Sequence, residues 1–350
     1  MRKLTSLIGV GLALAVLANT AWCQVPYRMH SHVLSAFRDV VSEPSKSTVQ
    51  VFSDGYKSSL GAIVGKDGYV LTKASELKGK IECQFHDGKR MEAQIVGKEP
   101  GMDLALLKVD AHDLPEITWN EAASLPVGSW LATPGLNRDP VAIGVLSVEP
   151  RKIPAPSGAM GVQLDMNDAR IIQVMPGSAA EKAGLLAQDL VLKVNGKEVK
   201  GRQELVDTIR AFQPGEKVDL LVQRGSDELA VTVTLGSLAQ IFQGEGHNRA
   251  EFQNNLGSQL SERRAGFPSV IQHDTVLKPS ECGGPLVDLD GKVVGINIAR
   301  AGRVESYALP TAVVKSVLAD LISGKLAPKL APEKVADMVK PVAEPAKKVQ

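Results

Sequence analysis

The stretch PSECGGPLV at residues 279–287 places two glycines and a proline directly after a cysteine. Two runs of β-forming residues follow, PLV at 285–287 and KVVGIN at 292–297, with Asp-Leu-Asp-Gly between them. A thiol presented by a tight glycine-rich loop has the character of a nucleophile if a base and hydrogen-bond donors stand near it. Cys282 is therefore the candidate reactive residue, and the rest of the sequence must supply its partners.

Short strand-like runs surround this loop on both sides. They share β-branched or alternating apolar residues and are separated by turn signals such as Asp67-Gly68 and Asp87-Gly88. The runs before the loop cover 48–52, 61–64, 69–72, 80–85, 91–97, 104–109, 127–132 and 141–148. Helical spacing predicts one short helix over 32–41 and a final helix from 311 that stops at Gly324. Many short strands at even spacing indicate a mainly β fold built as a barrel or sandwich.

Residues 151–264 have a different sequence pattern, which interrupts the series of predicted strands. Residues 151–158 are proline-rich and read as a linker, and 239–264 are polar and irregular, as in a return linker. Between them, strand patterns at 171–174, 190–194, 218–223 and 229–235 alternate with a helical pattern at 203–212. This organisation predicts a separate α+β module.

The ends of the chain have the composition of targeting and tail segments. Arg2 and Lys3 precede an apolar run at 7–18, which predicts an export signal over residues 1–23, or an anchor if it is not cleaved. Beyond it we expect no membrane span. Residues 326–350 are mostly Lys, Ala, Pro and Glu, which predicts a disordered tail. The net charge of +1 gives no general attraction to nucleic acid.

Residues 154–238 resemble a PDZ domain of the bacterial HtrA/Deg type. The resemblance rests on VMPGSAAEKAGL at 174–185 and DLVLKVNGK at 189–197. It implies that the module binds peptide C-termini or unfolded protein segments by adding a strand, although a spacer role is the structural alternative. By position, the expected peptide-binding residues are Gly158, Ala159, Met160, Gly161 and Val162 in the carboxylate loop, with Leu205 and Ile209 on the groove helix.

The flanks resemble the protease domain of the same family. The matching stretches are 59–72, 101–109 and the Cys282 loop, which is similar to the G-x-S-G-G-P-L loop of trypsin-like serine proteases. The resemblance implies a trypsin-like double β-barrel into which the α+β PDZ domain is inserted. We expect residues 28–150 to form the first barrel and the start of the second, 154–238 the insertion, and 239–325 the rest of the second barrel with its helix.

The catalytic positions implied by this resemblance are altered. Asp103 matches the aspartate, Cys282 stands at the serine position, and Ser75 stands at the histidine position. A serine hydroxyl cannot accept the nucleophile's proton at neutral pH and return it to the leaving amine. The oxyanion donors would be the N–H groups of Ser280 and Cys282, and Ser280 replaces the usual glycine. We therefore expect an exported, catalytically inactive protein that binds peptides in protein quality control of the cell envelope.

Two alternatives stay open. One is an active endopeptidase that uses Cys282 with an unidentified base, for which His273 and His86 are poor candidates because we expect both to be surface or structurally satisfied histidines. The other is a redox pairing of Cys282 with Cys83, although the resemblance implies that both thiols stay free.

Other roles have weaker support in the sequence. Since no second ligand pair accompanies Cys83 and His86, we expect neither a metal nor a cofactor. Arg263 and Arg264 are expected to form a solvated charge pair. HtrA-like proteins are often trimers, so the resemblance allows a homo-oligomer.

Overall fold

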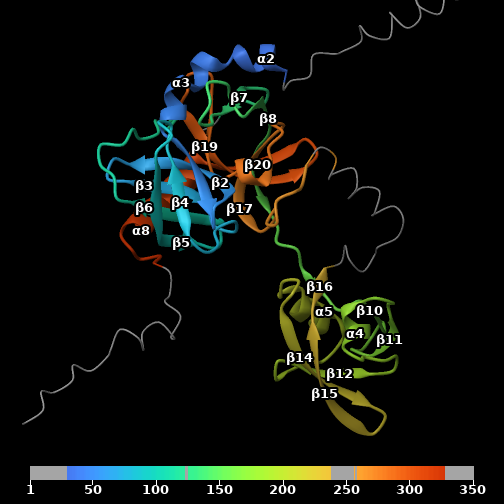
Figure 1. Cartoon of the computed structure of the whole chain (residues 1–350). Helices are drawn as coiled ribbons and strands as arrows, with labels where there is room; N and C mark the ends of the chain where they lie inside the picture. Colours follow the sequence, from blue (N-terminus) through green and yellow to red (C-terminus); the bar gives the residue numbers. More distant parts are fainter. Residues whose placement is uncertain (1–29, 123–124, 238–255, 257, 328–350) are drawn as a thin grey trace, which may run out of the picture.

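The computed structural model describes residues 30–122, 125–237, 256 and 258–327. Figure 1 shows two neighbouring β-barrels and a smaller unit, which follows β8 (Ala142–Ile153) of the second barrel along the chain. The expectation of a mainly β double barrel with an inserted α+β domain is confirmed. The export signal and all but the start of the tail lie outside the described residues.

The first barrel closes from six antiparallel strands in the order β1-β2-β3-β6-β5-β4. Its strands are β1 (Thr48–Ser53), β2 (Tyr56–Gly65), β3 (Tyr69–Lys73), β4 (Ile81–Gln84), β5 (Arg90–Glu99) and β6 (Leu104–Val109). The interior is filled by β-branched and aliphatic side chains such as Val49, Ile63 and Leu107, and it also holds Cys83. Closure leaves this barrel without a free sheet edge.

The second barrel is built from strands that lie on both sides of the inserted module. Its order is β17-β20-β19-β18-β7-β8. The strands are β7 (Trp130–Thr133), β8 (Ala142–Ile153), β17 (Phe267–His273), β18 (Pro285–Val287), β19 (Val293–Gly302) and β20 (Glu305–Pro310). The pairing of Phe267 with Ile153 joins β17 to β8, across more than a hundred residues of chain. The barrel therefore closes only after the chain has returned from the insertion.

The insertion begins and ends at one place. Its first strand, β9 (Gly158–Ala159), pairs with its last, β16 (Gly236–Ser237). Its remaining elements are β10 (Val162–Leu164), β11 (Ile171–Val174), α4 (Ala179–Lys182), β12 (Leu190–Val194), β13 (Lys197–Glu198), α5 (Arg202–Arg210), β14 (Lys217–Arg224) and β15 (Asp227–Thr234). The module has its own core, which includes Ile171, Leu205 and Val222. Ends that meet and a separate core are what allow a domain to be inserted without disturbing its host.

Helices cover the barrels. The single helix predicted over 32–41 is in fact two, α2 (Ser31–Ser35) and α3 (Arg38–Lys46), because Phe37 leaves helical geometry at φ −102°, ψ 8°. The final helix, α8 (Thr311–Ile322), packs on β5, where Gly97 leaves room for Leu321. The tail expected from residue 326 starts with a hydrogen bond from Lys98 N to Leu326 O. Within the described residues, no helix is long and apolar enough to cross a membrane.

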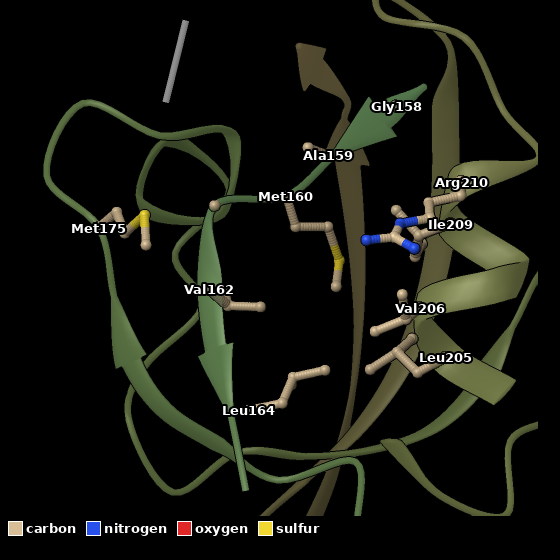
Figure 2. Close-up of a pocket in the computed structure, with 11 residues that line it drawn as sticks. Gly158, Ala159, Met160, Val162, Leu164, Met175, Leu205, Val206, Ile209 and Arg210 are labelled. Carbon is tan, nitrogen blue, oxygen red and sulfur yellow. The ribbon is translucent and has the colours of Figure 1, made fainter. Parts of the chain in front are cut away.

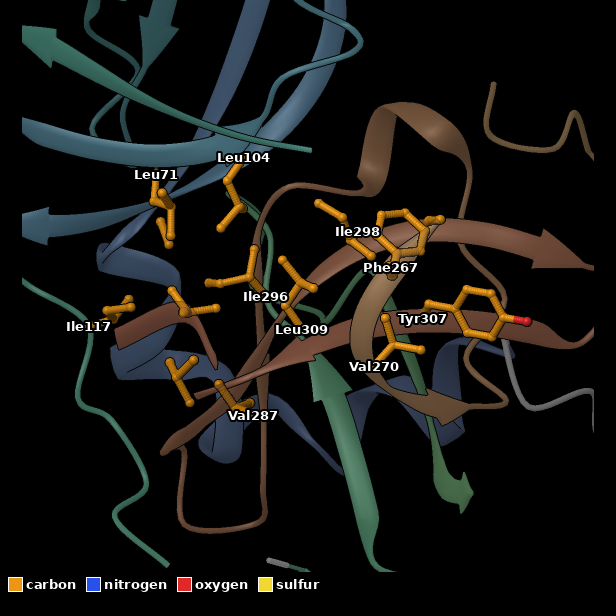
Figure 3. Packing of buried hydrophobic residues seen from close by; sticks show 14 of the residues in the cluster. Leu71, Leu104, Ile117, Phe267, Val270, Val287, Ile296, Ile298, Tyr307 and Leu309 are labelled. Carbon is orange, nitrogen blue, oxygen red and sulfur yellow. The ribbon is translucent and has the colours of Figure 1, made fainter. Parts of the chain in front are cut away.

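The two barrels share a hydrophobic core. Figure 3 shows Leu71 and Leu104 of the first barrel directed toward Ile296 and Leu309 of the second, and Figure 3 also shows Phe267 in the same cluster. All five of these side chains are fully buried. The barrels are therefore held in a fixed relation, and the residues at their junction form the candidate catalytic region.

Candidate active site and peptide groove

Ser75 and Asp103 lie together at the ends of two paired strands. β3 ends at Lys73 and β6 begins at Leu104, and these two residues pair across the ladder. The Ser75 N–H donates to Asp103 Oδ1 at 2.8 Å, and its hydroxyl donates to Oδ2 at 2.9 Å. Asp103 adopts a left-handed backbone, φ +59°, which an aspartate tolerates better than most residues. Ser75, which the family resemblance aligns with the histidine, thus lies beside the carboxylate.

The Asp103 carboxyl is nearly closed to solvent. It is 2% exposed, and this burial raises its pKa. The Lys73 ammonium and the Ser75 hydrogen bonds oppose that rise. Lys73 is itself fully buried, and its Nζ pairs with Glu76 Oε1 at 3.1 Å. The site therefore holds an aspartate and a lysine. The residue next to the carboxyl, Ser75, has no group that titrates near neutral pH.

Cys282 follows the one-turn 3₁₀ helix η1 (Pro279–Glu281) and is fully buried. Its carbonyl accepts from Leu60 N at 2.8 Å, which fixes the loop on β2. Burial raises the pKa of the Cys282 thiol to about 11, and the Lys73 charge is among the groups that oppose the rise. At neutral pH only roughly one thiol in ten thousand would be ionised. Because Lys73 acts on both Cys282 and Asp103, the thiol and the carboxyl lie in one region.

The glycines after Cys282 keep the loop in contact with the first barrel. Gly283 has φ +97°, and a Cβ there would collide with the Leu60 carbonyl and lie 2.7 Å from Thr72 Oγ1. The Gly283 N–H donates to Asn297 O at 2.7 Å. Only glycine combines this backbone with this approach. The glycine pair therefore shapes the junction of the barrels, whether or not the cysteine reacts.

One of the two predicted oxyanion donors, the Cys282 N–H, already has a hydrogen-bond partner within its own loop. The Cys282 N–H donates to Pro279 O at 3.2 Å, which closes the η1 turn around Ser280. The Lys278 N–H donates to Glu281 Oε2 at 2.8 Å and holds the same turn from its other end. A donor that already has a partner in the chain must break that bond before it can stabilise an oxyanion. The loop is therefore in a closed conformation.

Neither alternative histidine is placed as a base. His86 lies in the exposed turn between β4 and β5. His273 was expected to be a surface or satisfied histidine; it is fully buried, its Nδ1 bonds to Thr275 Oγ1 at 2.6 Å, and its Nε2 lacks a partner of normal geometry although the Asn297 side chain acts on the ring. Burial lowers the pKa of His273 to about 4. Its imidazole belongs to the interior of the second barrel.

The two cysteines of the described residues are both free and both buried. Cys83 lies inside the first barrel on β4, where burial raises its pKa to about 12. Within those residues, no group of three His, Cys, Asp or Glu could hold a metal ion.

Arg263 is not part of a solvated charge pair, which corrects the sequence-based expectation. Its guanidinium donates to the Pro100 carbonyl, to Gly101 O at 2.8 Å and to Gly266 O at 3.1 Å. It also lies 5.1 Å from the centre of the Phe267 ring. Arg264 by contrast bonds only weakly to the Ser261 carbonyl, at 3.4 Å.

A groove runs between β10 and α5 of the inserted module. Figure 2 shows Met160, Val162 and Leu164 on one side, facing Leu205, Val206, Ile209 and Arg210 on the other. All seven residues predicted from the sequence line this groove, and Leu164, Met175, Val206 and Arg210 were missed. Two of these had a periodic signal, since Leu164 is two residues beyond Val162 on a strand and Val206 lies three residues before Ile209 on the helix.

The groove offers unpaired backbone groups. β10 pairs with β11 along one edge only, and its other edge faces α5. The carbonyls of Met160 and Gly161 accept from Ala180 N and Met175 N, at 2.8 and 2.9 Å, which fixes the loop before β10. The N–H groups of these same two residues donate to no acceptor among the described residues. Backbone donors held in this way can receive a carboxylate.

Comparison with known proteins agrees with this architecture. Residues 158–235 match the model of the PDZ domain family. A probable periplasmic serine endoprotease DegP-like of Chlamydia muridarum is 28% identical over 264 residues, covering 50% of this chain and 53% of the relative. The chain contains a PDZ domain, and as a whole it is similar to DegP-like serine endoproteases. The DegP-like relative of Marinomonas sp. is 25% identical over 354 residues and covers 75% of each chain.

The match to the first relative therefore spans about half of that protein's length. Among solved structures, the serine endoprotease from Yersinia pestis is 20% identical and covers 58% of this chain and 98% of that one, with a TM-score of 0.29. The fold assignment rests on the strand order of the two barrels and of the PDZ domain.

Proposed function

We propose that this chain is an exported HtrA-like protein that binds peptide C-termini or unfolded segments through its PDZ domain and no longer hydrolyses peptide bonds. The observation that carries the proposal is the pair of hydrogen bonds from Ser75 to Asp103, which fills the position of the missing imidazole. Without a group that accepts and returns a proton, attack and amine departure both lack their catalyst.

The state of Cys282 supports the same proposal. A cysteine can react without a strong base only through its thiolate, and burial with a pKa of about 11 keeps this thiol protonated. Its backbone N–H is committed to Pro279 O. Attack on a carbonyl would therefore need the loop to open, the thiol to ionise and the donor to be released together.

An active cysteine endopeptidase is the second candidate. The buried Lys73 favours it, because its charge acts on Cys282 and a lysine amine can serve as a base. A lysine acts as a base only as the free amine, however, whereas Lys73 is ion-paired with Glu76. This candidate predicts that Lys73→Met abolishes any peptide hydrolysis by the purified protein.

Peptide binding by the PDZ domain is supported by the open edge of β10 and the unpaired N–H groups of Met160 and Gly161. A peptide added as a strand would place its last side chain against Val162, Leu205 and Ile209, so an apolar C-terminal residue is expected.

Export is supported by the N-terminal signal pattern and by the names of the relatives, which describe periplasmic proteins. A role in envelope protein quality control follows from the same family likeness.

Fluorescence anisotropy tests peptide binding directly. A labelled peptide ending in Val should bind, and the same peptide with an amidated C-terminus should bind at least about tenfold more weakly, because it loses the carboxylate. Val206→Glu, which places a charge in the groove, should weaken binding by a similar factor. Thr208→Glu on the same helix does not line the groove and serves as the control. Equal binding of the free and amidated peptides by all three proteins would contradict the proposal.

A further inference from the structure

Residues 258–264, here called the return strap, lie along the part of β19 that β18 leaves unpaired. β18 pairs with β19 only as far as Pro285 opposite Ile296, whereas β19 continues to Gly302. Beyond that point, Ser261 N donates to Arg300 O at 3.0 Å, and Arg300 N donates to Ser261 Oγ at 2.9 Å. The strap thus takes the place that an added strand would take on this edge.

The side chain of Arg300 reinforces this attachment. Arg300 is 1% exposed, and its guanidinium donates to Ser258 Oγ and to the Leu277 carbonyl at 3.0 Å. A buried cation needs such acceptors, because an unpaired charge in the interior is strongly unfavourable. The strap therefore supplies one of the acceptors, Ser258 Oγ, that stabilise the buried charge of Arg300.

The other end of the strap is attached to the first barrel. Arg263 donates to the carbonyls of Pro100 and Gly101, in the turn that leads to Asp103. The strap therefore bridges the two barrels at the face that holds Asp103 and Cys282. Its Ser261 hydroxyl and the Arg300 backbone both act on the Cys282 thiol, against the burial that raises the pKa of that thiol.

The strap is held mainly by polar contacts. Its sequence, Ser-Gln-Leu-Ser-Glu-Arg-Arg, has a single large apolar residue, Leu260. Segments with few buried apolar contacts open locally at a lower free energy than the core around them. Opening of the strap is therefore expected to cost less free energy than unfolding of either barrel, although it removes the acceptors that Ser258 and Ser261 offer to Arg300.

We propose that the return strap is a displaceable plug, which occupies the free edge of β19 in place of an extended peptide and keeps Cys282 out of solvent. Displacement of the strap exposes the thiol and the edge around Arg300. This inference is independent of PDZ binding and of whether the chain hydrolyses peptides. It concerns only whether residues 258–264 cover Cys282 and the edge of β19 at the junction of the barrels.

Thiol labelling with N-ethylmaleimide, followed by mass spectrometry of the peptides, tests this proposal in the full chain. Cys83 is an internal reference, since it is buried inside the first barrel and becomes reactive only when that barrel unfolds. Arg263→Ala removes the attachment to the first barrel and should speed labelling of Cys282 about tenfold relative to Cys83. Arg264→Ala is the matched control, because its hydrogen bond stays within the strap, and it should change the ratio by less than about twofold.

A second variant acts on the other attachment. Ser261→Pro removes the N–H that Arg300 O accepts and should also raise the labelling ratio of Cys282 to Cys83. Faster labelling of Cys282 alone in both variants supports the plug. An unchanged ratio in both, or an equal rise in Arg264→Ala, would overturn it. Parallel acceleration of both cysteines would also overturn it, because the strap would then open only with global unfolding.

Discussion

Ser75 holds both oxygens of the Asp103 carboxylate, through its backbone N–H at 2.8 Å and its hydroxyl at 2.9 Å. Ser75 is the residue that the family resemblance aligns with the histidine of trypsin-like enzymes. It satisfies a nearly buried carboxyl that would otherwise lack donors. Both oxygens of the Asp103 carboxylate are thus hydrogen-bonded to Ser75.

Restoring the triad residues should restore their geometry. In the double variant Ser75→His and Cys282→Ser, we expect the imidazole to lie about 2.6–3.2 Å from Asp103 and from the new hydroxyl. The reason is that Lys73 and Leu104 fix the strand ends that carry positions 75 and 103. A crystal structure of the double variant checks this. Side chains at 75 and 282 that remain far apart would show that Ser75 does not correspond to the histidine position.

The stability of the barrels should fall with rising pH in the alkaline range. An unfolded cysteine ionises near pH 8.5, whereas burial raises the pKa to about 11 for Cys282 and about 12 for Cys83. Above about pH 8.5 the unfolded chain therefore loses protons that the folded chain keeps, and the free energy of unfolding drops by up to about 1.4 kcal/mol per pH unit for each thiol.

Urea unfolding between pH 7 and 11 measures this slope. Cys282→Ala and Cys83→Ala should each make it shallower, and the double variant should make it shallowest. An unchanged slope in both single variants would mean that the thiols ionise normally in the folded protein.

The PDZ domain should depend on the ion pair between Arg224 and Asp189. Arg224 Nε and Nη2 donate to the two oxygens of the buried Asp189 carboxylate, at 2.7 and 2.8 Å. Asp189→Asn should lower the stability of this domain by about 1.5–3 kcal/mol, as expected for hydrogen bonds to a charged group. Asp168→Asn, in the exposed pair with Arg170, should have an effect within about 1 kcal/mol and is the control.

The same ion pair makes the stability of the PDZ domain sensitive to acid. The Arg224 hydrogen bonds lower the pKa of Asp189. The stabilisation is therefore complete above the pKa of an aspartate in the unfolded chain, about 3.9. It is lost as the pH falls through the lower pKa that Asp189 has in the folded protein. In thermal unfolding below pH 4, the difference in stability between the wild type and Asp189→Asn should shrink as the pH falls. A difference that stays constant down to pH 2 would contradict this assignment.

Much of this fold is readable from residue patterns. Alternating apolar residues such as Val49, Val51 and Ile63 predict the strands of the first barrel, because a pleated strand turns every second side chain inward. The peptide groove was expected on other grounds, because Gly158 to Val162 and the helix with Leu205 and Ile209 were placed by their resemblance to PDZ domains. Local periodicity and turn chemistry decide the strands of the first barrel.

The return strap and the closed Cys282 loop could not be predicted in this way. Arg263 bonds to the backbone carbonyl of Pro100, 163 residues away, and a carbonyl acceptor leaves no trace in the sequence. Likewise, the bond from Cys282 N to Pro279 O depends on the backbone conformation of η1 and not on which side chains it carries. The break between α2 and α3 at Phe37 was missed because apolar spacing continues through it.

The most direct test of the central claim is the hydrolysis of unfolded casein by the purified full chain, compared with Cys282→Ala and with Cys83→Ala as the control for loss of a buried thiol. The account predicts that none of the three proteins releases peptides above the buffer background, because Ser75 supplies no base for Cys282. Turnover by the wild type and by Cys83→Ala that disappears in Cys282→Ala would contradict it.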